Sequence, residues 1–125
     1  ARKNIPVVSG SIEKIHCVHT LEHFYRVELE EGVLPEFYRV LGTGRWCYLA
    51  VPNWETVKKD RNWLEAQKYL YGGHQGDPLD CHHVCFDYEN LKEMLEKVGF
   101  KNIKKIPYEE GAHDKTLTLA VECVK

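Results

Sequence analysis

The sequence has 125 residues, of which 43% are hydrophobic and 11% aromatic, enough for one domain with a single core. Its 17 basic and 19 acidic residues give a formal net charge of −2 and no basic run longer than two, which argues against nucleic acid or an anionic membrane as partner. No segment approaches the roughly 18 to 20 consecutive apolar residues of a membrane helix, so we expect a soluble protein. Five cysteines, without the spacing of a secreted disulfide framework, predict reduced thiols in a cytoplasm.

The N-terminal half predicts a strand, a helix and a second strand. Residues 13–19 form a short, mostly apolar and β-prone run that follows a Ser-Gly-Ser turn, and we expect a buried strand. Residues 29–41 carry apolar side chains at helical spacing, but Pro35 predicts a kink or a late start near Val33. Glycines 42 and 44 are expected to end this helix, and residues 45–51 then read as a strand. Such a βαβ unit has parallel strands, whose carboxyl ends, residues 19–23 and 53–54, are the expected ligand site.

The C-terminal half predicts two helices and two further strands. Residues 54–71 have an amphipathic pattern, and residues 72–83 form a long polar loop of the kind that is often functional. Asp87 is the predicted N-cap of a helix over residues 88–98, which Gly99 ends. Residues 101–107 and 116–124 are predicted strands that pair antiparallel, joined by a loop over residues 108–115.

Two metal sites are compatible with the histidines. Residues 19–23, His-Thr-Leu-Glu-His, match the His-x-x-Glu-His motif of inverted zinc peptidases, in which His19 and His23 would bind zinc and Glu22 would act as base. That motif requires a helix, because only helical periodicity puts both imidazoles on one face, whereas the preceding residues favour a strand. The second site would join one of His16, His19 or His23 to Cys81, His82, His83 and Cys85. The alternative is a loop whose histidines are solvated or hydrogen-bonded.

The same residues resemble a known family when they are read in order. His-Thr-Leu-Glu-His at 19–23, Glu-Phe-Tyr-Arg-Val-Leu-Gly-Thr-Gly-Arg at 36–45 and Val-Pro-Asn at 51–53 are similar to three signatures: H-x-L-E-H, E-x-x-R-V-L-K-P-G-G and V-P-D. These belong to class I S-adenosylmethionine-dependent methyltransferases of the type 11 branch. The resemblance continues through Tyr-Gly-Gly-His-Gln at 71–75, His82 four residues before Phe86, and the Val-Gly-Phe that ends at residue 100. It covers the chain from about residue 13 to the C-terminus.

This resemblance implies an α/β fold, a partial Rossmann-like methyltransferase sheet with strands equivalent to 4-5-7-6, the last antiparallel, and flanking helices. Residues 1–125 would form a single methyltransferase-like domain, truncated at the N-terminus. The family's glycine-rich turn, where the backbone approaches the cofactor, has no counterpart here, and Asn53 replaces the acid of V-P-D. We therefore expect methyltransferase activity only if the missing cofactor motif is supplied.

The resemblance also implies roles for individual residues. S-adenosylmethionine would be the cofactor, bound by His19, Leu21 and Glu22. His19, Glu22 and His23 would be catalytic, and a base among them would take the acceptor's proton. The side chains near a small-molecule acceptor would be Asn53, Gln75 and His82. No metal ligand follows from this interpretation.

The strand over residues 13–19 is central in the family, so half of its sheet would be missing here. An unpaired, apolar strand edge favours pairing with another chain. We expect a homodimer or a missing N-terminal segment to cover it, or residues 1–8 to fold back over it. The alternative function is a non-catalytic domain that uses the half-fold for dimerisation or partner binding.

Overall fold

A computed structural model describes residues 4–59, 71–72, 81–108 and 115–125. Its strands form one sheet in the order β1-β2-β4-β3. The strands are β1 (Ile12–Val18), β2 (Leu41–Pro52), β3 (Lys101–Ile106) and β4 (Thr118–Val124). β1 pairs parallel with β2, and β4 pairs antiparallel with both β2 and β3. The predicted α/β fold and 4-5-7-6 strand order are therefore confirmed, with the last strand antiparallel.

The connection between β1 and β2 is helical but starts earlier than predicted. After the 3-10 turn η1 (Leu21–His23) come α1 (Arg26–Glu28), the π turn η2 (Leu29–Val33) and α2 (Leu34–Val40). The regular helix α2 starts at Leu34, close to the late start predicted at Val33. Irregular helical turns precede it, and the Tyr25 amide caps the first of them by donating to Oε1 of Glu28 at 2.9 Å. Pro35 lies in the first turn of α2, behind the wide π turn, where a missing N–H is tolerated.

β2 begins directly at the end of α2. The helix ends at Val40, within one residue of the predicted stop, but β2 starts four residues earlier than predicted. Gly42 and Gly44 therefore lie inside β2, in a bulge where the pairing moves from Ile12 with Leu41 to Lys14 with Trp46. Gly44 has a φ of 80°, which favours glycine.

The remaining elements are of the predicted type, but the helix predicted over residues 54–71 ends at Val57, with residues 58–59 in a turn, and β3 ends at Ile106. Asn53 caps α3 (Trp54–Val57) by accepting the Glu55 amide at 3.1 Å, and residues 60–70 of the predicted helix lie outside the described residues. α5 (Tyr88–Val98) is confirmed, with Asp87 accepting the Asn90 amide at 2.8 Å. The 3-10 turn η4 (Lys115–Leu117) precedes β4, so this strand starts two residues later than predicted.

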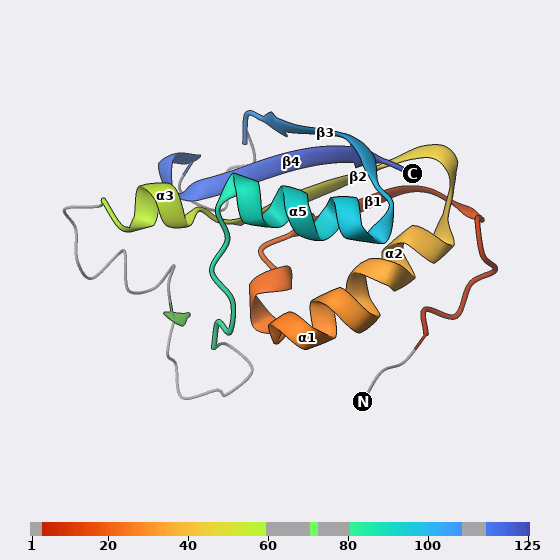
Figure 1. Ribbon diagram of the computed structural model, residues 1–125, viewed down its shortest axis with the longest axis horizontal. Helices are drawn as coiled ribbons and strands as arrows, with labels where there is room; N and C mark the ends of the chain where they lie inside the picture. The colour runs from red at the N-terminus through yellow and green to blue at the C-terminus, as the bar shows by residue number, and fades with distance from the viewer. Residues whose placement is uncertain (1–3, 60–70, 73–80, 109–114) are drawn as a thin grey trace.

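The helices pack on one face of the sheet (Figure 1). Alternate β2 residues Leu49 and Val51 belong to the main core, together with Leu34 of α2 and Leu91 of α5. On the other face, Tyr48 begins a smaller cluster with Ala50, Tyr108 and Ala120. β1 was predicted to be buried, which is wrong: none of its residues is fully buried, because it has one neighbouring strand. Within the described ranges, no helix is long and apolar enough to cross a membrane.

Candidate functional site

The turn after β1 carries the residues on which the sequence analysis centres. The His19 amide donates to the carbonyl oxygen of Ala50 at 2.7 Å, which extends the parallel pairing by one residue. His19 then adopts a φ of 48°, uncommon for a residue with a side chain, and the chain turns into η1. As a result Leu21 and Glu22 both point inward, each with 0% of its surface exposed.

Glu22 is surrounded by three imidazoles. Its Oε1 lies 3.5 Å from Nδ1 of His19, 3.9 Å from Nε2 of His23 and 3.9 Å from Nε2 of His82. Neither carboxylate oxygen has a hydrogen-bond partner in the described part of the protein. The exposed fractions of the His19, His23 and His82 side chains are 7%, 27% and 10%, so His23 is the most open to solvent.

A distant segment holds this turn in place. The His83 amide donates to the carbonyl oxygen of Glu22 at 2.7 Å, and Nδ1 of His23 lies 3.2 Å from the carbonyl oxygen of Cys81. The rings of His23 and His82 meet edge to face, with centroids 4.7 Å apart. The amide of His82 donates to the carbonyl oxygen of Tyr71 at 3.1 Å, which ties both parts of the predicted loop together.

The structure places the predicted site residues in four different settings. The structure brings His19, Glu22, His23 and His82 together. The Leu21 side chain packs in the main core, so only its backbone is available to a ligand. Asn53 lies beside Phe86 in an isolated parallel bridge, with its side-chain oxygen engaged in capping α3. Gln75 lies outside the described residues.

The two metal hypotheses from the sequence do not match this geometry. The helix required by a zinc-peptidase motif is not formed, because His19 follows a strand and only residues 21–23 make a 3-10 turn. Of the four residues in the second hypothesis, only His82 joins the cluster. Cys81 contributes a backbone carbonyl, Cys85 is exposed, and the His83 ring stacks on Tyr25 with centroids 4.2 Å apart.

Sequence reasoning missed the contacts that position His19. Its Nε2 lies 3.0 Å from Oγ1 of Thr118, the first residue of β4. Its ring meets that of Tyr108 edge to face, with centroids 6.1 Å apart. Thr118 pairs with Pro52 at the carboxyl end of β2, so only the order of strands in the sheet, and no local pattern, could have placed it there.

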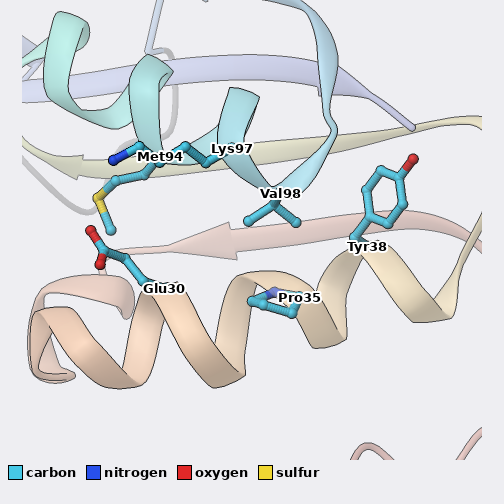
Figure 2. A pocket seen from close by; sticks show the side chains of 6 residues that line it. All are labelled: Glu30, Pro35, Tyr38, Met94, Lys97 and Val98. Atoms are coloured by element: carbon cyan, nitrogen blue, oxygen red, sulfur yellow. The ribbon is translucent and has the colours of Figure 1, made fainter.

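A cavity of about 350 Å³ opens away from this cluster, between the helical connection and α5 (Figure 2). Glu30, Pro35 and Tyr38 line one side, facing Met94, Lys97 and Val98 of α5. None of these residues belongs to the group around Glu22. The cavity therefore offers no part of the candidate site.

No protein-family model and no curated protein matches the sequence. Several solved structures match the fold. A SAM-dependent methyltransferase from Archaeoglobus fulgidus has 15% identity and a TM-score of 0.66, over 95% of this chain and 62% of that chain. A possible histamine N-methyltransferase from Thermotoga maritima has 16% identity and a TM-score of 0.63, over 98% and 60%.

Human N-acetylserotonin methyltransferase, solved in complex with SAM, has 10% identity and a TM-score of 0.65, over 99% of this chain and 31% of that chain. The chain thus spans from about a third to about three fifths of the length of these structures. Similarity at such low identity shows the fold.

Proposed function

Because the chain has the fold of class I S-adenosylmethionine-dependent methyltransferases, we propose that it forms the part of such an enzyme where methyl donor and acceptor meet. One observation carries the proposal. Glu22 and the histidines around it gather at the carboxyl ends of the parallel strands β1 and β2, where open α/β sheets bind their ligands. S-adenosylmethionine is the proposed cofactor.

The burial of each residue suggests its role. His19, Leu21 and Glu22 would lie on the cofactor side, with Leu21 and Glu22 contributing backbone groups since their side chains are buried. The more exposed His23 and His82 would face the acceptor.

Methyl transfer needs a nucleophilic atom aligned with the sulfonium methyl group, and a base for any proton that atom carries. Of the predicted catalytic residues His19, Glu22 and His23, the histidines would supply this base, since the Glu22 side chain is buried, while Asn53, Gln75 and His82 would orient a small-molecule acceptor. The sequence has no glycine-rich turn before His19, so we expect turnover only when that motif is supplied.

The free cysteines fit a cytoplasmic location.

Titration with S-adenosylhomocysteine, followed by amide NMR spectra, tests cofactor binding by this chain. We expect the largest shifts at residues 19–22 and a weaker response at Asn53. His19→Ala should reduce these shifts, whereas His16→Ala, an exposed change on the same strand, should not. Spectra that stay unchanged at millimolar ligand would contradict the proposal for this chain.

We also propose that another polypeptide segment covers the free edge of β1. Among the described residues β1 pairs with β2 alone, and residues 4–11 form no strand against it. A missing N-terminal segment is the occupant that fits a methyltransferase, and a second copy of the chain is the alternative. Light scattering distinguishes them: a mass near 14.6 kDa excludes the homodimer, and twice that mass supports it.

A further inference from the structure

We propose that Glu22, His23 and His82 bind a divalent transition-metal ion. One carboxylate oxygen and two imidazole nitrogens converge, with all ligand atoms within 4.8 Å of one another. The turn after β1 supplies two of the ligands, and the segment before α5 supplies the third. Carboxylate and neutral imidazole are ordinary ligands of such ions.

The hydrogen bond between His23 and Cys81 indicates which ring nitrogen of His23 carries a proton, and so which one can bind a metal ion. A carbonyl oxygen only accepts, so the contact of 3.2 Å with Cys81 requires Nδ1 to carry the proton. Nε2 of the neutral ring then presents a lone pair to the carboxylate oxygen 3.9 Å away. A metal ion bound between these two acceptors would satisfy both of them. A ligating histidine characteristically donates its other N–H to a carbonyl or carboxylate in this way.

The burial of Glu22 supplies an independent argument. Its side chain is fully buried, and both oxygens lack a hydrogen-bond partner in the described ranges. A buried carboxylate without donors is costly, and such groups are normally paired or coordinate a metal. His23 and His82 each place a ring nitrogen within 4.8 Å of this carboxylate, and neutral imidazole nitrogens are of the kind that complete a metal site.

The spacing fits an ion after a small contraction. Zinc bonds of about 2.0–2.2 Å place two ligand atoms of a tetrahedral site about 3.4 Å apart. The separations of 3.9 Å from Glu22 to His23 and to His82 are therefore about half an ångström wider than a closed site, and the ligand atoms of the two histidines, which lie within 4.8 Å of each other, must also draw together. Three protein ligands leave at least one position open, and the partial exposure of His23 gives access to it.

His19 is a positioning residue in this proposal. Its Nδ1 lies 3.5 Å from Oε1 of Glu22, while Nε2 is held by Thr118. An ion would join the strand-end turn to His82, which is far away in the sequence, and so would stabilise the fold. This prediction does not depend on methyl transfer.

The test uses protein freed of metal with EDTA and titrated with Zn²⁺ or Co²⁺. Calorimetry should show a single ion per chain, and the melting temperature should rise because only the folded state assembles the site. Bound Co²⁺ should give visible d–d bands without the near-ultraviolet charge-transfer band of thiolate ligands. Absence of saturable binding would overturn the proposal and leave Glu22 to be satisfied by water or a proton.

Variants distinguish this site from casual binding to surface histidines. His82→Gln and His23→Gln should each weaken affinity by at least about 100-fold, since even indirect partners of a ligand cost 10- to 100-fold. His83→Gln is the matched control, because this neighbouring ring stacks on Tyr25 and lies outside the cluster. Cys81→Ser should also leave affinity unchanged. An equal loss in the His83 or Cys81 variants would refute the assigned ligands.

Discussion

Nε2 of His82 lies 3.9 Å from Oε1 of Glu22, although the two residues are far apart in the sequence. Their backbones are joined as well, through the His83 amide and the carbonyl oxygen of Glu22 at 2.7 Å. The segment before α5 therefore closes over the end of β1. This contact brings two segments that are distant in the sequence into one site. The buried carboxylate of Glu22 lies at its centre.

The first prediction concerns the stability of the metal-free protein. Glu22→Gln keeps the shape of the side chain but removes a buried group that has acceptors only, and the new amide can donate to a neighbouring imidazole. In EDTA at pH 7, the free energy of unfolding should therefore rise by about 1 to 3 kcal/mol. Urea unfolding measures this change.

The same variant should gain no stability from added zinc. Glu22→Gln is therefore expected to be more stable than the original protein in EDTA and less stable than it with zinc bound. Glu13→Gln is the control, since this residue is exposed on β1 and should change stability by less than about 0.5 kcal/mol. A clear loss of stability for Glu22→Gln in EDTA would mean that the carboxylate has a favourable partner, which contradicts its proposed role.

Arg39 anchors the N-terminal segment. Its guanidinium donates to the carbonyl oxygens of Val7 and Ile5 at 3.1 and 2.9 Å, and to Oγ of Ser9 at 2.9 Å, and it also pairs with Glu36. Arg39→Met should lower stability, and by more than the loss of a single exposed ion pair, because several hydrogen bonds to a charged donor are lost together. Proteases should then cleave residues 4–10 faster.

The control for Arg39 is Arg26→Met. Arg26 also pairs with a glutamate on the same helical connection, Glu30, but its side chain is 71% exposed and no described contact ties it to the N-terminal segment. Exposed ion pairs contribute about 0 to 1 kcal/mol, so proteolysis of residues 4–10 should not change. If both variants behave alike, the anchoring role of Arg39 is wrong.

The helix α5 was predictable from the sequence because capping residues mark both of its ends. α5 has a capping aspartate, a regular apolar face and a terminal glycine, and its predicted bounds agree with the structure. The sequence pattern places Gly42 and Gly44 in a turn after the helix, whereas they lie in a bulge of β2, because glycine is common both at helix ends and in strand bulges. Only the pairing partner, β1, distinguishes these outcomes.

The candidate site was predictable only in part, for the same reason. His19, Glu22 and His23 are neighbours in the sequence, so one strand-end turn already groups them. His82 entered the prediction through the family resemblance and through the second metal hypothesis, but neither predicted its contact with Glu22. Thr118 depends on β4 lying between β2 and β3, an arrangement set by the whole sheet and not by residues near the site.

Cysteine reactivity should follow burial and pKa. Burial raises the pKa of Cys17 to about 11 from an ordinary value of 9.0, against an opposing hydrogen bond with Thr20. At pH 8 its thiolate fraction is then about 100-fold below that of an unshifted thiol. A hydrogen bond with Cys123 and burial raise the pKa of Cys47 further, where the two thiols face each other across β2 and β4.

Alkylation at pH 8 followed by peptide mass spectrometry should therefore modify the exposed Cys85 first and the half-buried Cys17 slowly, while the buried Cys47 and Cys123 react only after unfolding. The reaction of Cys17 should accelerate as the pH rises toward its pKa, because the reactive thiolate forms there. Burial also raises the pKa of Cys85, so its reaction too should quicken above pH 8. Rapid labelling of Cys47 in the folded protein would contradict the sheet register.

Gly99 and Gly10 form a matched pair for the last prediction. Both have a left-handed backbone, with φ values of 120° and 74°, so an alanine is strained at either position. At Gly99 a Cβ would also lie 3.1 Å from Cζ of Tyr38, whose ring packs edge to face on Phe100, while no atom lies within 4 Å at Gly10. Gly10→Ala should lower the free energy of unfolding by about 1 kcal/mol, and Gly99→Ala by about 1 to 3 kcal/mol more, since the Tyr38 ring must shift. Equal costs in urea unfolding would show that Tyr38 yields freely, and that α2 and α5 pack more loosely at this contact than the structure indicates.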